Sequence, residues 1–169
     1  MSGSEVDPAR IAVGGESAGG NLAAVAASRM RGAVALQLLE APVLDVTGTP
    51  SASRDEVERD FPALDAMRRR TARRYVEAGA DPADPEVSPL LAGDLAGLPP
   101  ALLLAADVDP WREDAVRYAA ALSGAGVSAR VSVFEGIVHG TQSFVELLPA
   151  ARRWHAECVA ALSTMAVPS

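Results

Sequence analysis

Short apolar runs alternate along the chain with longer segments whose apolar residues recur every three or four positions. The short runs indicate buried strands, and the helical period of the longer segments indicates amphipathic helices. Strands are predicted at 10–14, 33–39, 101–106 and 129–134, and helices at 21–31, 63–78, 113–123 and 144–163. Strands that alternate with helices are typical of a mostly parallel sheet covered on both faces, so the pattern predicts an α/β fold of about four strands.

Apolar faces within these elements predict how they pack. The predicted face of 21–31 carries Leu22, Val25, Ala26 and Met30, and that of 63–78 carries Leu64, Met67, Thr71, Tyr75 and Ala78. The alternation in 129–134 predicts a strand near the edge of the sheet. The stretch 47–61 is polar and charged with no strand period, and the prolines of 81–85 predict a loop.

The composition fits one folded domain. The chain has 169 residues, 49% hydrophobic and 22% charged, which is enough apolar material for a core and too much for a disordered tail. A formal net charge of −7 argues against a nucleic-acid partner, because phosphates bind a net basic face. The single cysteine, Cys158, excludes a disulfide framework and a zinc cluster.

The chain also lacks the usual membrane and secretion signals. Uninterrupted apolar runs such as Ala101–Ala106 are far shorter than a membrane span. The first five residues are polar and acidic and do not resemble a secretory signal. We therefore expect a cytoplasmic protein with no membrane partner.

The strongest chemical signal is Gly15-Glu16-Ser17-Ala18-Gly19, a Gly-x-Ser-x-Gly pattern. The pattern alone is weak, but it follows a predicted strand and opens a predicted helix. A nucleophile elbow requires this placement, because the sharp turn lifts the serine hydroxyl clear of the sheet. Side chains at Gly15 and Gly19 would collide with the neighbouring strand or helix, and the helix amino terminus favours developing negative charge.

A nucleophilic serine requires a base and a group that orients the base. His139 directly follows the fourth predicted strand, whereas His155 lies within the last helix, where a packed or surface histidine is expected. Asp109 follows the third predicted strand. Ser17, Asp109 and His139 thus lie at carboxyl ends of strands, where parallel sheets place their sites, in the chain order of the α/β-hydrolases.

Five stretches together resemble the carboxyl-terminal half of an α/β-hydrolase of the hormone-sensitive-lipase-like carboxylesterase family. They are 7–23, 88–90, 98–101, 109–113 and 136–140. The resemblance implies that Ser17 is the nucleophile, Asp109 the triad acid and His139 the base. Asp107 is the rival acid, but the family pattern places the carboxylate directly before proline. The resemblance further implies a serine carboxylesterase that hydrolyses small acyl esters and needs no metal or organic cofactor.

Some positions depart from the family pattern. Glu16 stands where the family has Asp or Thr, Ala41 where an aromatic residue is common, and Thr141 where a bulky residue follows His-Gly. These departures affect the predicted substrate pocket and not the triad. The upstream His-Gly-Gly loop, which supplies oxyanion donors in the family, is absent from this sequence, so the amide of Ala18 is the remaining predicted donor.

The resemblance implies a single α/β-hydrolase domain over residues 1–169, truncated on its amino-terminal side. One side of the strand Ile11–Val13 is then an open apolar edge, which proteins normally cover or charge. We expect a homodimer or a complementing chain at this edge of the elbow strand. One rival hypothesis is a non-catalytic remnant or subunit that needs a partner to complete the sheet and the oxyanion hole. Another is that Met1 is not the biological start.

Three further features have ordinary interpretations. The basic run within 68–74 follows acidic residues in 55–60, so it is predicted to be a solvated helix face with local counter-charges rather than an anion site. Cys158 has apolar neighbours and is predicted to be an inert core residue. Trp111 either lines the pocket or packs, and the sequence leaves both alternatives open.

Overall fold

The computed structural model describes residues 7–165, whose strands form one parallel sheet in the order β1-β2-β3-β4. The strands are β1 (Ala12–Glu16), β2 (Leu36–Glu40), β3 (Ala101–Val108) and β4 (Ala129–Val138). The helices are α1 (Ala18–Arg29), α2 (Ala52–Asp60), α3 (Pro62–Glu77), α4 (Arg112–Gly124) and α5 (Pro149–Met165), with short 3-10 turns η1 (Pro8–Arg10), η2 (Pro89–Leu91) and η3 (Thr141–Ser143). The predicted α/β fold is confirmed.

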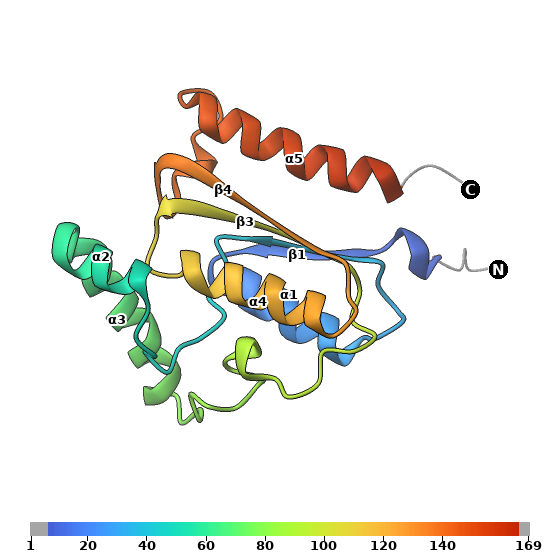
Figure 1. Ribbon diagram of the computed structural model, residues 1–169, viewed down its shortest axis with the longest axis horizontal. Helices are drawn as coiled ribbons and strands as arrows, with labels where there is room; N and C mark the ends of the chain where they lie inside the picture. Colours follow the sequence, from blue (N-terminus) through green and yellow to red (C-terminus); the bar gives the residue numbers. More distant parts are fainter. Residues whose placement is uncertain (1–6, 166–169) are drawn as a thin grey trace.

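The sheet has a layer of helices on each face. Helices α1 and α4 cover one face and α5 crosses the other, while α2 and α3 lie beside the carboxyl ends of the strands (Figure 1). Successive residues of β2 and β3 enter opposite layers: Leu39 and Leu103 face α1 and α4, whereas Leu38 and Leu104 face α5. These central strands are buried on both sides, which explains their continuous apolar sequences.

Edge positions are occupied by β1 and β4. The alternating sequence of 129–134 correctly predicts an edge strand, and β4 continues to Val138, directly before His139. The strand predicted at 10–14 extends to Glu16, so β1 delivers the chain to Ser17.

The predicted apolar face of the first helix is wrong. Leu22 and Met30 are 64% and 45% exposed. The residues of α1 that are buried are instead Gly20, Asn21, Ala23, Ala24 and Ala27. Small side chains bring the helix axis close to β1 and β2, so packing selects the small-residue face over the face with the larger apolar side chains.

Two helices differ from the predicted elements. The polar stretch 47–61 contains α2, which Ser51 caps by accepting a hydrogen bond from the amide of Arg54 at 3.4 Å. Helix α5 begins at Pro149 rather than at Phe144, because η3 and a turn precede it. On α3, Met67 is exposed, whereas Tyr75 packs on the body of the protein as predicted. Within residues 7–165 no helix combines the length and the apolar character needed to cross a membrane.

Candidate active site

The turn between β1 and α1 holds Ser17 in an unusual backbone conformation. Ser17 has φ 55° and ψ −117°, within the positive-φ region that side chains rarely adopt. Its amide donates to the carbonyl of Glu40 at 2.8 Å, and its carbonyl accepts from the amide of Val43 at 3.2 Å. Two backbone hydrogen bonds to the chain around the end of β2 therefore hold the turn, which places the Ser17 hydroxyl beyond the end of the sheet.

Glycines permit the close approach of strand, turn and helix. A Cβ on Gly15 would collide with the carbonyl of Gly19, as the sequence predicts. A Cβ on Gly19 meets nothing within 4 Å, so that part of the prediction is wrong. The second tight position is Gly20, where a Cβ would lie 2.8 Å from the Cβ of Pro42. Gly20, which sequence reasoning did not single out, sets the distance between α1 and the chain after β2.

A continuous hydrogen-bonded chain joins Ser17, His139 and Asp109. The Ser17 hydroxyl and Nε2 of His139 are 2.9 Å apart, and Nδ1 of His139 lies 2.8 Å from Oδ2 of Asp109. A carboxylate only accepts, so Nδ1 carries the proton and Nε2 is free to accept from the serine. The three residues come from the ends of β1, β3 and β4, as predicted, although they lie far apart in the sequence.

The other candidates of the sequence analysis lie elsewhere. The side chain of Asp107, the rival acid, pairs with Arg112 at 3.1 Å. His155 is an exposed residue of α5. Asp109 is only 1% exposed, and its Oδ1 accepts from the amide of Trp111 at 2.9 Å. Of the two aspartates, Asp109 is thus the one that faces the imidazole.

Trp111 forms the wall behind the imidazole. Its ring centroid lies 5.0 Å from that of His139, with the ring planes at 55°. The indole is 3% exposed and packs with Val43 and Val46. The alternative left open by the sequence is therefore resolved in favour of packing, in direct contact with the candidate base.

The electrostatic surroundings raise the pKa of His139 above its usual 6.5. Burial acts to lower this pKa, but the hydrogen bond and the charge of Asp109 outweigh burial, and the charge of Glu16 adds to them. Glu16 is exposed on the last residue of β1. The glutamate that departs from the family pattern thus adds to the raised pKa of His139, the candidate base, and is not a core residue.

Beside Asp109 lies a buried ion cluster that the sequence did not reveal. Nη2 of Arg54 donates to both carboxylate oxygens of Asp114, at 2.7 and 3.0 Å, and to the carbonyl of Asp45 at 3.2 Å. Burial raises the pKa of Asp114 to about 7, with Arg54 opposing and Asp45 and Asp109 adding to the increase. The cluster attaches α2 to the first turn of α4, which follows Asp109.

A buried amide fixes the chain on the other side of Ser17. Nδ2 of Asn21 donates to the carbonyls of Val43 and Val87, both at 2.8 Å. Asn21 lies within the stretch that resembles the family, but no argument from its spacing identified this role. It holds α1 against two loops at the carboxyl edge of the sheet.

The candidate oxyanion donor is Ala18, the first residue of α1. Amides in the first turn of a helix have no acceptor within the helix, so this N–H is available to a ligand. The helix dipole adds to its attraction for negative charge. Ala18 is the donor that the sequence predicts, directly after the candidate nucleophile Ser17.

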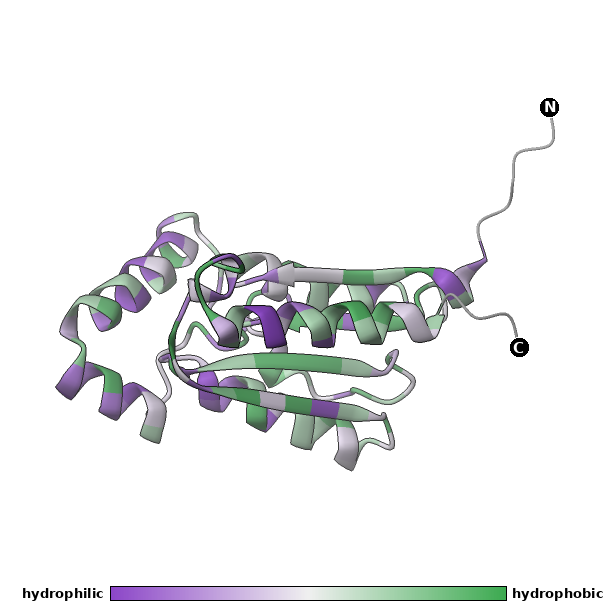
Figure 2. Cartoon of the chain, turned by 90° about the horizontal axis from the view of Figure 1, so that it is seen from above, coloured by the Kyte–Doolittle hydropathy of each residue, from purple (hydrophilic) through white to green (hydrophobic). Residues whose placement is uncertain are grey.

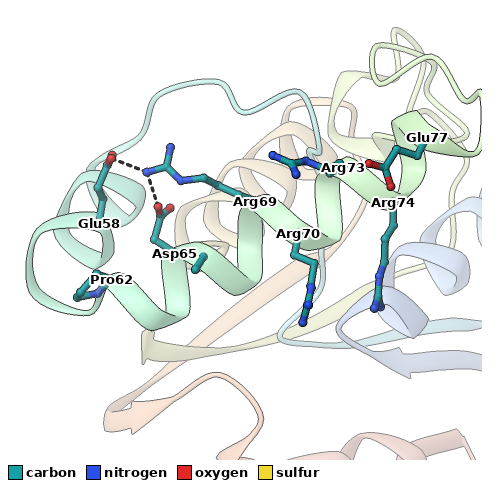
Figure 3. Close-up of a pocket in the computed structure, with 9 residues that line it drawn as sticks. Glu58, Pro62, Asp65, Arg69, Arg70, Arg73, Arg74 and Glu77 are labelled. Carbon is teal, nitrogen blue, oxygen red and sulfur yellow. Dashed lines mark hydrogen bonds and ion pairs between the residues drawn. The ribbon is translucent and has the colours of Figure 1, made fainter.

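The arginine-rich run lies on α3, away from these residues. Arg69 pairs with Glu58 and Asp65, and Arg68 pairs with Asp65, as the expectation of local counter-charges requires. A groove of about 640 Å³ runs along this helix. Figure 3 shows that Arg70 and Arg74, two of the residues lining it, extend to the same side. Cys158 is buried and lies 3.6 Å from Oε2 of Glu40, which agrees with its predicted core position.

Comparisons with known proteins extend over nearly the whole chain. A family model described as the alpha/beta hydrolase fold matches residues 2–143, which include Ser17, Asp109 and His139. Among curated relatives from Mycobacterium tuberculosis, carboxylesterase NlhH is 38% identical over 165 residues and carboxylic ester hydrolase LipN is 35% identical over 148 residues. These alignments cover 92% and 83% of this chain, but 51% and 39% of the relatives. The chain spans about half the length, or less, of these curated relatives.

Solved esterase structures have the same fold. EstE1, a thermostable carboxylesterase from a metagenomic library, aligns with a TM-score of 0.84 and 38% identity over 96% of this chain and 57% of its own. An esterase from the archaeon Pyrobaculum calidifontis aligns with a TM-score of 0.81 and 37% identity over 96% of this chain and 55% of its own.

Proposed function

The chain belongs to the α/β-hydrolase family, and from this premise we propose that it hydrolyses carboxylic esters of small acyl groups by a Ser17–His139–Asp109 triad. The observation that carries the proposal is the hydrogen-bonded chain from the Ser17 hydroxyl through the imidazole to Asp109. The relatives named as carboxylesterases support the same reaction class.

In the proposed reaction, Oγ of Ser17 attacks the ester carbonyl while Nε2 of His139 takes the hydroxyl proton. Asp109 holds the imidazole in the required tautomer and stabilises the imidazolium. The tetrahedral intermediate places its negative oxygen near the amide of Ala18. When the intermediate collapses, His139 protonates the departing alcohol. Water, activated by the same imidazole, then releases the acid from the acyl-serine.

The oxyanion site determines the expected rate. Ala18 is the donor that the elbow itself supplies, and loss of one oxyanion donor typically lowers turnover by about 10²–10³. We therefore propose slow turnover for the chain alone. The alternative function is a subunit that binds and acylates at Ser17 but turns over only with a complementing chain. What favours it is that the candidate oxyanion donor identified within residues 7–165 is the amide of Ala18.

Hydrolysis of p-nitrophenyl acetate by the purified chain tests the proposal. Ser17→Ala should abolish turnover, whereas Ser128→Ala, an exposed serine after α4, should retain it. A fluorophosphonate probe should label the wild type and not Ser17→Ala. Labelling without turnover would favour the subunit alternative, and equal rates for wild type and Ser17→Ala would reject the esterase.

A further inference from the structure

The peptide group between Pro110 and Trp111 bonds to the candidate acid on one side and to α2 on the other. Its N–H, from Trp111, donates to Oδ1 of Asp109 at 2.9 Å. Its C=O, from Pro110, accepts from the hydroxyl of Ser53 in α2 at 3.4 Å. A trans peptide group is planar, so its C=O and N–H point in opposite directions from one rigid unit. Ser53 and Asp109 therefore hold the same peptide group from its two ends.

The hydroxyl of Ser53 lies in the protein interior and also contacts the start of α4. Ser53 is 1% exposed, so its hydroxyl depends on protein partners. The hydroxyl accepts from the amide of Glu113 at 3.4 Å and lies 3.3 Å from the hydroxyl of Ser51. Amides in the first turn of a helix have no acceptor within it, and the N-cap residue Trp111 provides no side-chain acceptor. Ser53 thus donates to the chain just before α4 and accepts from the first turn of α4.

Ion pairs close to Ser53 hold α2 against the first turn of α4. Nη2 of Arg54 binds the buried carboxylate of Asp114 at 2.7 and 3.0 Å, and Glu56 binds Arg112 at 2.9 Å. Two of the three buried residues of α2 are polar, Ser53 and Arg54. Figure 2 shows α2 and α3 at the left end of the molecule, with many hydrophilic residues in purple. The polar sequence of α2 is therefore explained by its contacts with α4 and with the turn before α4.

We propose that Ser53 is a positioning residue of the candidate triad: by holding this peptide group, it keeps the Trp111 amide on Asp109. The other oxygen of Asp109 then meets Nδ1 of His139, at 2.8 Å. A hydroxyl that donates to the carbonyl also polarises the peptide group, which strengthens its N–H as a donor. The proposal rests on the proposed esterase function, because Ser53 acts through the triad and does not touch the substrate.

A role of Ser53 in capping α4 and a role in positioning Asp109 have different consequences. If Ser53 only capped α4, its loss would lower the free energy of unfolding and leave the bond between Asp109 and His139 unchanged. If Ser53 positions the acid, its loss also lets the Trp111 amide turn away from the carboxylate. Asp109 is 1% exposed, so Oδ1 would then be a buried oxygen without its donor, and the carboxylate would rotate to regain one.

Hydrolysis of p-nitrophenyl acetate by Ser53→Ala tests the proposal, with Ser88→Ala as the matched control. Ser88 is also buried, and its hydroxyl likewise joins two backbone groups, the amide of Val46 at 3.0 Å and the carbonyl of Pro82 at 2.7 Å. Ser53→Ala should lower kcat about tenfold, because acylation and deacylation both use the triad, and leave KM within about twofold. Ser88→Ala should lose stability in urea and keep its kcat. Equal losses of kcat in the two variants would overturn the proposal.

Proton NMR of the free protein measures the bond between Asp109 and His139 without turnover. The Nδ1 proton of His139 is bonded to a carboxylate, so its resonance should lie far downfield. In Ser53→Ala this resonance should move upfield, and the pKa of His139 should fall, because Asp109 stabilises the imidazolium less well. Glu16, the other charged group that raises this pKa, is unchanged in the variant. Ser88→Ala should match the wild type in both measurements.

Ser53→Cys covers the case in which Ser53→Ala does not fold. The thiol fills nearly the same space as the hydroxyl but is a weak donor, so Ser53→Cys should fold and show the same changes to a smaller extent. A folded variant of either kind with the wild-type kcat and the wild-type His139 resonance would overturn the proposal. A wild type without esterase activity, in which Ser53→Ala still moves the His139 resonance, would reject the proposed function and leave Ser53 as the residue that orients Asp109.

Discussion

The indole of Trp111 packs 5.0 Å from the imidazole of His139, while the backbone amide of Trp111 donates to Asp109 at 2.9 Å. One residue therefore restrains both the candidate base and the candidate acid. The ring limits rotation of the imidazole, and the amide fixes one oxygen of Asp109 so that the other meets Nδ1.

Trp111→Phe should lower kcat by about ten- to hundredfold, because the smaller ring lets the imidazole shift from its line between Ser17 and Asp109. Trp154→Phe is the matched control, since Trp154 is equally buried but packs on Phe134 and donates to Glu40. Both variants should lose stability in urea. An equal loss of kcat in both would show that Trp111 acts only through stability.

The raised pKa of His139 predicts the pH dependence of activity. The base must be neutral, so kcat/KM should rise with pH through an inflection above 6.5. Glu16→Gln removes a charge that favours the imidazolium, so the inflection should move to lower pH. Glu77→Gln, on α3, should leave the profile unchanged. An inflection that stays in place in Glu16→Gln would show that this carboxylate does not act on the base.

The raised pKa of His139 also predicts how the free energy of unfolding changes with pH. A folded-state pKa above the unfolded value means that the native protein binds this proton more tightly. The stabilisation from His139 is fully present below about pH 6.5 and is lost as pH rises through the folded-state pKa. Urea titrations of the wild type and His139→Ala at several pH values should show their difference shrinking as pH rises.

Arg54→Met should reduce the free energy of unfolding by about 3–5 kcal/mol, because it leaves the Asp114 carboxylate buried without its partner. The loss should be smaller at pH 6 than at pH 8, since Asp114, with a pKa already raised to about 7, then becomes neutral in the folded protein. Adding Asp114→Asn should recover much of the stability. Arg59→Met, at an exposed ion pair, should leave the stability essentially unchanged.

Substitutions of the adjacent glycines Gly19 and Gly20 test how closely α1 packs on the chain after β2. Gly20→Ala places a methyl group 2.8 Å from Pro42 and should cost about 1–3 kcal/mol and lower activity, because α1 must move from the chain after β2. Gly19→Ala has free space and should be neutral or slightly stabilising, as alanine favours helix. Equal effects at both positions would contradict this account. Urea unfolding and ester hydrolysis measure the two consequences.

The sequence pattern predicted those features of the fold and the candidate site that depend on the order of strands and helices along the chain. Ser17, Asp109 and His139 were predicted to lie together because each follows a strand and parallel strands bring their carboxyl ends together, and the structure places them in hydrogen-bond contact. The face of α1 was predicted incorrectly because periodicity weighs Leu22 and Met30 by hydrophobicity, whereas close packing on the sheet selects Ala23, Ala24 and Ala27.

The hydropathy pattern within each segment does not predict contacts between residues that are far apart in the sequence. Helix α2 is almost entirely polar, and Arg54 anchors it to Asp114, sixty positions away in the sequence. Gly20 and Asn21 depend likewise on Pro42 and Val43, whose positions follow from the assembled sheet. No period or spacing within a single segment encodes such contacts.

Ser17, the candidate nucleophile, directly follows β1, which lies at one end of the strand order of the described residues. Ser17 has a backbone conformation that costs about 1–3 kcal/mol, and within residues 7–165 the pairing with β2 and the packing of α1 hold β1 against that cost. On warming, β1 should exchange its amide hydrogens and release the turn before α4 and β3 open. The reactivity of Ser17 toward a fluorophosphonate probe should then fall on warming while the helical circular dichroism signal of the fold is still intact.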